Sequence, residues 1–350
     1  VSQPVAAWLS DRIDSRLFGP IGLLLAAICL SSIGLATSMT TLSVIYVLGM
    51  IGVGIFHPVG ASSMGQLAAS LPGSRRSLGV SLFFVAGMLG GITGSLMAPR
   101  IAAQPGGFDW LRYAMIPGLL VAALLHLAIA RVPHRDHQVP VRVAGETGRR
   151  WRMVALLYCS NAMRFTVNMT LFYLFVRWAQ AAVRKNGAVA EAQVAAAAAP
   201  INGNLVALVV LGMAMGGLVA GGTIRPGRET LPLILVPICF APAVALFGRA
   251  SVPVGYFLAV AAGVGFAAMI PVTISLSQRL LPNRTSLASG LMLGGAWSLA
   301  IVGPAAAEFC LHTLELSLET TFQLTAALLA LSGVVCVFLS GEGLRNHASQ

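Results

Sequence analysis

The sequence predicts an all-α polytopic membrane protein built from two pseudo-symmetric helical halves. Three observations predict this fold class: the composition, the charge-free segments and an internal repeat. Of 350 residues, 57% are hydrophobic and only 9% are charged, and the mean hydropathy is +0.84. An average soluble chain has about 25% charged residues. The composition therefore excludes a soluble globular protein.

The charge-free segments give the predicted helices. A membrane-spanning helix needs about 20 mostly apolar residues, because the hydrocarbon core is about 30 Å thick. Residues 17–74 contain no Asp, Glu, Lys or Arg, and the polar residues 37–41 divide them into two helices. The other predicted spans are residues 77–99, 113–130, 153–176, 192–224, 230–248, 250–278, 285–307 and 320–341. These segments do not alternate polar and apolar residues as barrel strands do. Ten visible spans are expected, with the Ala-rich residues 191–200 in a loop.

The distribution of Lys and Arg predicts the orientation. Most of them fall in one alternate set of loops, which the positive-inside rule places in the cytoplasm. Topology thus explains the net charge of +11 without a nucleic-acid partner. The expected location is a multi-pass position in a bacterial inner (plasma) membrane. The predicted organisation is an N-terminal half at 1–131, a cytoplasmic linker at 132–152, a C-terminal half at 153–341 and a cytoplasmic tail at 342–350.

The two halves share one repeated stretch. Residues 52–94 align with residues 263–303 at a nearly constant separation, so that Pro58 pairs with Pro271. Duplicated halves are typical of secondary transporters. The second half contains six predicted spans, whereas the first contains four and, at residues 3–9, the end of another. The repeat therefore predicts twelve spans in total, two of them upstream of a truncated N-terminus.

Several motifs resemble those of the major facilitator superfamily. Residues 6–16 (AAWLSDRIDSR) are similar to the loop signature after the second span of that family, and Asp11, Arg12 and Arg16 match it. Stretches that resemble the fosmidomycin-resistance branch are residues 3–5, 55–58, 75–87 and 277–294. The resemblance implies the major facilitator fold with a central cavity. It also implies that Asp11, Arg12 and Arg16 form a conformational-switch loop, for which a plain loop salt bridge is the alternative.

The sequence departs from that branch at several positions. Val59 stands where the branch has an acid, Met88 where it has an Asn, and Arg279 where it has a Glu. The resemblance therefore does not carry over a substrate or a coupling ion.

Arg164 is the sharpest candidate for a functional residue. An Arg at mid-bilayer costs about 2.5–3.5 kcal/mol on insertion scales, so it is seldom left facing lipid. Asn161, Arg164 and Asn168 share one face of a predicted helix. We expect them to form a polar stripe that lines the cavity and binds or gates an anionic solute. A buried Arg that only ties helices together is the alternative.

His57 is the candidate for carrying a proton, because it lies beside Pro58 in a span that the resemblance places along the cavity. A histidine that is merely packed is an equal alternative. No acid lies in the middle of a predicted span, so coupling falls to His57, to a carboxylate in upstream helices or to none. Gln66 and Gln278 lie at nearly corresponding places of the repeat and are expected to cap helices, with substrate contact as the alternative.

Glycines four residues apart let helices approach closely. We expect such packing where the two halves move against each other, at Gly87, Gly91, Gly94, Gly212, Gly216, Gly290 and Gly294.

The sequence thus predicts a secondary active transporter that moves a small anionic or drug-like solute by alternating access, as an efflux antiporter in drug resistance. An enzyme is not expected, since the spans contain no HExxH, phosphate loop or Ser-His-Asp arrangement. The alternatives are an inactive truncated remnant, a non-transporting membrane partner and, less favoured, a polytopic membrane enzyme. Expected partners are the solute and the lipid bilayer, with a monomeric chain, no metal and no cofactor beyond a proton gradient.

Overall fold

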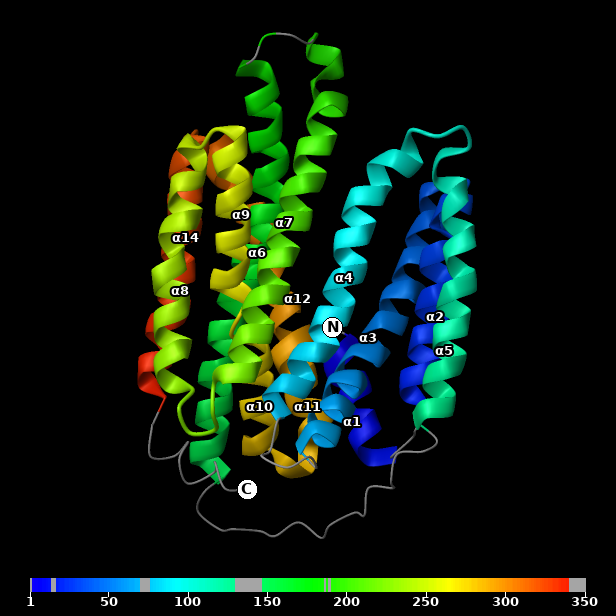
Figure 1. The fold of residues 1–350 in the computed structure, drawn as a ribbon, viewed down its shortest axis with the longest axis vertical. Coiled ribbons are helices and arrows are strands. Elements are labelled where there is room, and N and C mark those ends of the chain that lie inside the picture. Colours follow the sequence, from blue (N-terminus) through cyan, green and yellow to red (C-terminus); the bar gives the residue numbers. More distant parts are fainter. Residues whose placement is uncertain are drawn as a thin grey trace.

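The computed structural model describes residues 2–13, 17–69, 76–129, 147–185, 187 and 190–339, and these contain helices and no strand. Figure 1 shows the helices standing side by side, with most of their connections at the two ends of the bundle. The N-terminal half contains α1 (Ser2–Ile13), α2 (Phe18–Ser31), α3 (Met39–Ala69), α4 (Arg76–Ala102) and α5 (Met115–Ile129). The C-terminal half contains α6 (Thr147–Lys185), α7 (Val194–Thr223), α8 (Thr230–Ala245), α9 (Val252–Ala267), α10 (Ile270–Leu280), α11 (Thr285–Gly290), α12 (Ala296–Ala300), α13 (Val302–Glu308) and α14 (Leu318–Val334). The all-helical fold class is confirmed.

Within the described part of the chain, eight helical segments are long and apolar enough to cross a membrane. They correspond to eight of the ten predicted spans, with α9 and α10 forming one segment and α11 to α13 another. The two remaining predicted spans are α2, which is apolar but shorter, and α6, which is long but carries Arg164 in its middle.

Two of the predicted spans are interrupted. The helix of residues 252–280 breaks at Ala268 and Met269, just before Pro271, which cannot donate a backbone hydrogen bond. Between α11 and α12 the chain forms a π-helical turn over Leu291–Gly295. Such turns leave backbone carbonyls available for other partners. Both interruptions lie near the contact between the halves.

Two predicted loops are partly wrong. Residues 194–200 begin α7, because Ala has the highest helix propensity and because Val194 and Ala198 pack against Ala179 and Val183 of α6. Residues 147–152, which were expected in the linker, begin α6. The rest of the linker and the tail at 342–350 lie outside the described residues.

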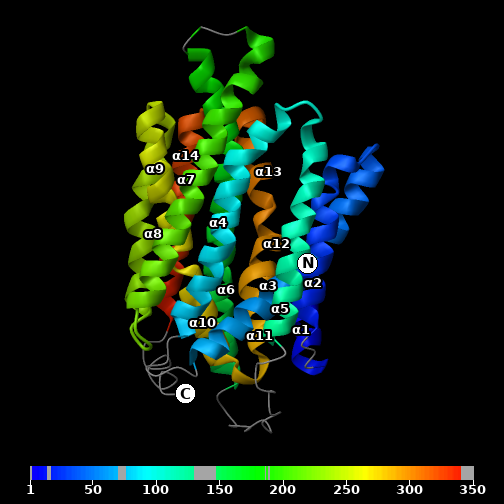
Figure 2. The ribbon, with the colours of Figure 1, turned by 45° about the vertical axis from the view of Figure 1, so that its right-hand side comes forward.

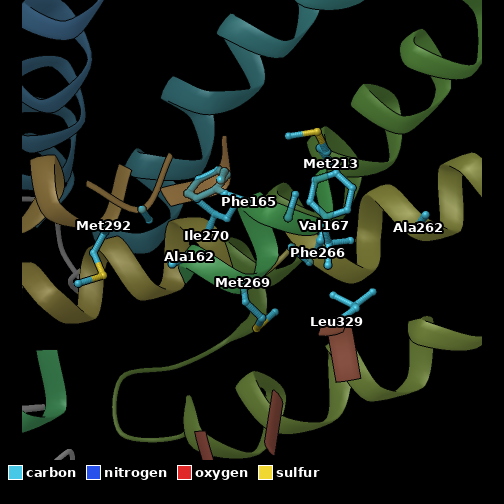
Figure 3. Close-up of a cluster of buried hydrophobic side chains, with 14 of the residues drawn as sticks. Ala162, Phe165, Val167, Met213, Ala262, Phe266, Met269, Ile270, Met292 and Leu329 are labelled. Carbon is cyan, nitrogen blue, oxygen red and sulfur yellow. The ribbon is translucent and has the colours of Figure 1, made fainter. Parts of the chain in front are cut away.

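The hydrophobic core lies mainly in the C-terminal half. Figure 3 shows side chains from α6, α7, α9 and α14 meeting there, among them Phe165, Met213, Phe266 and Leu329. In the candidate spans of this half, 28–78% of residues are buried, against 6–17% in those of the N-terminal half. The C-terminal half is therefore the more tightly packed of the two.

The halves meet at one end of the bundle. We call this the closed end: it is the end at which α3 ends and α4 begins, at the bottom of Figure 1. There, α10 and α11 of the C-terminal half lie beside α3, α4 and α1 (Figures 1 and 2). Toward the opposite end, which we call the open end, α4 diverges from α7 (Figure 1).

Candidate functional site

A cluster of hydroxyl and amide side chains joins the halves at the closed end. The hydroxyls of Ser62, near the end of α3, and Thr285, the first residue of α11, lie 2.9 Å apart. Gln66 Nε2, one turn after Ser62, donates to Thr285 Oγ1 at 2.9 Å and to Ser62 Oγ at 3.1 Å. Ser62 and Thr285 are both buried. Three polar side chains from the two halves thus satisfy one another away from solvent.

Gln278 of α10 makes a second connection between the halves. Its side chain is fully buried, and Nε2 donates to Ser289 Oγ at 2.9 Å and to the Ala61 carbonyl of α3 at 3.5 Å. Its Oε1 faces α3 at Gly65, where an added Cβ would lie 2.5 Å away. The absence of a side chain at Gly65 is what lets the amide approach the α3 backbone. We call Ser62, Gln66, Gln278, Thr285 and Ser289 the gate cluster.

Close backbone approach accompanies the gate cluster. At α1 and α11, a Cβ added to Gly290 would lie 2.7 Å from Ala7 Cβ and 3.1 Å from the Gln3 carbonyl oxygen. Gly294, one turn later, faces the Gln3 side chain. Any side chain at these two glycines would push α1 and α11 apart, so two of the predicted packing glycines lie between the halves.

At the closed end, α4 and α7 are also in direct contact. Ser81 Oγ donates to the Gly217 carbonyl of α7 at 2.8 Å, and Gly221 lies against Ser77 and Ser81. The sequence did not single out Ser81, although it falls inside the repeated stretch.

Farther along α4 the glycines no longer pack closely. Nothing lies within 4 Å of a Cβ added to Gly87, Gly90 or Gly94, and at Gly91 the nearest atom is a Val210 methyl at 3.6 Å. The close packing predicted at Gly87 and Gly94 is not found. Between them, Gly91 still lies beside Val210 of α7, and α4 diverges from α7 toward the open end (Figure 1).

Gly212 and Gly216 pack closely, but inside one half. Gly212 lies against the Val260 carbonyl of α9, and a Cβ at Gly216 would lie 2.9 Å from Ala268 Cβ. These two glycines bring α7 onto α9 instead of bringing the halves together.

Arg164 lies fully buried near the middle of α6. Its Nη2 donates to the Leu233 carbonyl of α8 at 3.1 Å, and its Nε donates to Ser332 Oγ of α14 at 3.4 Å. Because helical side chains tilt toward the N-terminus of their helix, the guanidinium points toward the closed end, where α8 begins. Both of these partners belong to the C-terminal half, so in this conformation Arg164 ties three helices together.

The two asparagines of the predicted polar stripe reach other helices. Asn161 Nδ2 donates to Thr273 Oγ1 of α10 at 2.8 Å and to the Met292 carbonyl, in the π-helical turn, at 3.3 Å. Asn168 Nδ2 faces the Met213 sulfur of α7 at 3.9 Å. All three side chains of the stripe are buried, but each has different neighbours, and the partners named here all lie in the C-terminal half.

His57 lies on α3, where its Nδ1 is 3.1 Å from the Val53 carbonyl one turn back. Its ring meets Phe56 and Phe83 edge to face, with centroid distances of 5.6 and 6.0 Å. These contacts are those of a packed histidine, and the role of His57 in carrying a proton stays a prediction.

Little of the predicted switch loop lies within the residues that the structure describes. Asp11 and Arg12 lie in α1, but their side chains are not described, and Arg16 lies outside the described residues.

One buried ion pair was missed by sequence reasoning. Arg279 of α10 pairs through Nη2 with Glu229, the residue before α8, and both side chains are more than 90% buried. No regular spacing relates the two residues, so no sequence signal could have paired them. Among the described residues, no group of three His, Cys, Asp or Glu side chains could hold a metal ion.

Comparisons with known proteins identify the family to which this chain is similar. Residues 1–182 match the model of the Major Facilitator Superfamily. Over 340 residues the chain is 24% identical to the fosmidomycin resistance protein of Escherichia coli (strain K12), a match covering 96% of this chain and 80% of that protein. It is 31% identical over 134 residues to the uncharacterized MFS-type transporter YfnC of Bacillus subtilis (strain 168), covering 37% of this chain but only 30% of that relative's length.

Solved structures share the fold. The E. coli fucose:proton symporter FucP (N162A) gives a TM-score of 0.72 at 12% identity, covering 97% of this chain and 87% of that one. FucP in the outward conformation gives 0.72 at 12% identity, covering 97% and 86%. The human organic anion transporter MFSD10 (TETRAN) gives 0.63 at 18% identity, covering 95% and 80%. At these identities the likeness concerns the fold alone.

Proposed function

The chain belongs to the major facilitator superfamily, and on this premise we propose that it is a secondary active carrier working by alternating access. Family and fold are those of membrane transporters. In such a carrier, two halves rock about a central path and expose it to one side of the membrane at a time. We assign the described conformation to the state that is shut at the closed end.

One observation carries the proposal: the contact between the halves is one-sided. Described residues of both halves meet through the gate cluster and through Gly290 at the closed end. Along the outer part of α4, by contrast, Gly87, Gly90 and Gly94 face open space. A helical bundle with a purely structural role would gain nothing from leaving one end of this contact unpacked.

The chemistry of the gate cluster suits reversible opening. A hydrogen bond contributes only about 0.5–1.5 kcal/mol net, because water replaces the lost partner when the contact opens. Ser62, Gln66 and Thr285 can therefore part into water at small cost. Glycines such as Gly290 add close contact without burying a large apolar side chain. A closed end sealed by Leu and Phe would be far costlier to open.

For the solute we propose a small anionic or drug-like molecule moved outward. The support is the relative named for fosmidomycin resistance, which this chain matches over 96% of its length. We place the closed end in the cytoplasm, because the basic residues Arg76, Arg225 and Arg228 lie there. The conformation would then be outward-open, and the proton gradient would supply the energy, with His57 as the candidate carrier.

For Arg164 we propose a positioning role within the C-terminal half. By holding α6 to α8 and α14 it would keep that half rigid while the halves rock. This role differs from direct contact with the solute, and the two are separated by the variant described in the Discussion.

The function is tested by accumulation of labelled fosmidomycin in inside-out vesicles from cells lacking their own exporter. We expect the chain to drive accumulation above empty-vector vesicles, and a protonophore to abolish the difference. A Gln278→Ala variant should lower the rate, and Gly87→Ala, at an open position, should match wild type. Equal accumulation with and without the chain, or no effect of the protonophore, would contradict proton-driven efflux of this solute.

A further inference from the structure

A basic cavity lies at the closed end, between the two halves. It has a volume of about 260 Å³. The N-terminal half contributes the start of α4, and the C-terminal half contributes the end of α7, the loop that follows it, and α10. The polar residues that line it are Arg76, Ser77, Arg225, Ser275 and Arg279. It is separate from the gate cluster and from Arg164.

The lining favours an anion. Three arginines line the cavity, and no Asp or Glu is among the residues that line it. Arg76 is the first residue of α4, a helix of 27 residues, so the backbone N–H groups and the positive end of the helix dipole also lie there. Ser77 and Ser275 add two hydroxyl donors. Such a set of donors matches the several oxygens of a phosphate group.

Arg279 supplies an independent sign of a ligand. Its residue is only 8% exposed, and its bond to Glu229 uses Nη2 alone. The other two nitrogens, Nε and Nη1, have no hydrogen-bond partner among the described residues. Buried donors on a charged group are costly to leave unsatisfied. Arg279 itself lines the cavity, so a small shift of its side chain toward a bound anion would give these nitrogens acceptors.

We propose that this cavity binds a phosphate-bearing anion, either free phosphate or the phosphate of a lipid headgroup. Because Arg76 belongs to one half and Arg225 and Arg279 to the other, the bound anion bridges the halves. Opening the closed end would separate these groups, so the anion stabilises the closed conformation. Binding is measurable without transport, so the outcome is independent of the proposed solute and direction.

The test uses the purified full chain in detergent, unfolded by heat in the presence of a thiol-reactive dye. With Cys159, Cys239 and Cys310 replaced by Ser, the dye reports exposure of the buried Cys29 and Cys336. Sodium phosphate is titrated against sodium chloride at matched ionic strength. We expect phosphate to raise Tm by about 2–4 °C, since a ligand that binds only the folded state stabilises it. Short-chain phosphatidic acid is titrated in parallel against short-chain diacylglycerol.

The matched variants are Arg225→Gln and Arg228→Gln, which lie on the same exposed loop, the first lining the cavity and the second outside it. We expect Arg225→Gln to weaken the apparent affinity about tenfold and Arg228→Gln to leave it unchanged. The double variant Glu229→Gln, Arg279→Gln removes both buried charges together and should lose the Tm shift while remaining folded.

Each outcome is decisive. A shift with inorganic phosphate identifies a free-anion site, and a shift with phosphatidic acid alone, lost in Arg225→Gln, identifies a headgroup site. No shift with either probe, or equal losses in Arg225→Gln and Arg228→Gln, would overturn the proposal, because both results reduce the effect to general charge screening.

Discussion

At the closed end the halves touch through hydroxyls, amides and glycines, with Ser62 and Thr285 at 2.9 Å and Gly290 against Ala7. Along the outer part of α4, by contrast, nothing lies within 4 Å of a Cβ added to Gly87, Gly90 or Gly94. Both regions are rich in glycine, so composition does not distinguish them. What differs is whether a side chain added there would meet the other half. The contrast indicates that glycine lets the halves touch at the closed end, whereas the glycines along the outer part of α4 leave space unfilled.

A second contrast is between the packing inside the C-terminal half and the weaker contact between the halves. Inside the C-terminal half, Phe175, Phe247 and Phe322 stack with centroids about 5 Å apart, and many apolar side chains are fully buried. Between the halves, the hydrogen bonds of Ser62, Gln66, Ser81 and Gln278 described above all join neutral groups. The weaker contact is the one expected to open, because each neutral hydrogen bond is worth about 1 kcal/mol net.

The largest effect is expected from a side chain at the tight glycine of the closed end. Gly290→Leu would force α1 and α11 apart, since even a Cβ would lie 2.7 Å from Ala7 Cβ. Overpacking of this kind costs about 1–3 kcal/mol or more, which shifts a two-state balance about tenfold per 1.4 kcal/mol. We expect transport to fall at least about tenfold, measured in vesicles at matched protein levels.

The control for this change is Gly87→Leu, at a position that faces open space in the described conformation. It should cost much less in the closed state. If Gly87→Leu and Gly290→Leu reduced transport and Tm equally, the difference between the two ends would have no functional meaning.

Arg164→Met sharpens the comparison by acting outside the contact between the halves. It leaves the Leu233 carbonyl and Ser332 without their donor, at a cost of about 1–3 kcal/mol. We expect a lower Tm of the purified protein and a reduced amount in the membrane, with the KM for the solute unchanged per folded molecule. A normal Tm with KM raised about tenfold would instead assign Arg164 to solute binding.

A smaller effect is expected at the gate cluster. Gln278→Ala removes the bonds to Ser289 and to the Ala61 carbonyl and should weaken closure by about 0.5–1.5 kcal/mol. The reactivity of a cysteine in place of the buried Ser62, one residue after Ala61, should rise by roughly two- to tenfold for a probe added from the closed end. Unchanged reactivity would show that Gln278 does not help to close this end.

The fold was predictable because charge-free segments of the required length leave little choice in a bilayer. The interruptions of the helices were harder to predict. Pro271 can be read from the sequence, but the break before it depends on packing. For Arg164, burial followed from the cost of an exposed charge, whereas its partners did not. A helix surrounded by neighbours offers a buried site on every face. The sequence does not say that Leu233 lies next to the face that carries Arg164.

The gate cluster was harder still. Gln278 and Ala61 are 217 residues apart in sequence, and their contact exists only when the halves meet. Gln66 and Gln278 were expected to cap helices, and the repeat pointed to both segments without showing that they bond across the halves. The glycines at 87 and 290 share the same local spacing signal, and only the conformation tells which one is in contact.

The most direct test is a reversible lock at the closed end. The Ser62 and Thr285 hydroxyls lie 2.9 Å apart, so Ser62→Cys, Thr285→Cys should form a disulfide when the five native cysteines are replaced. The account predicts that oxidation crosslinks the halves and stops transport, and that a reductant restores it. Transport that continues at the uncrosslinked rate with the disulfide fully formed would contradict alternating access through this end.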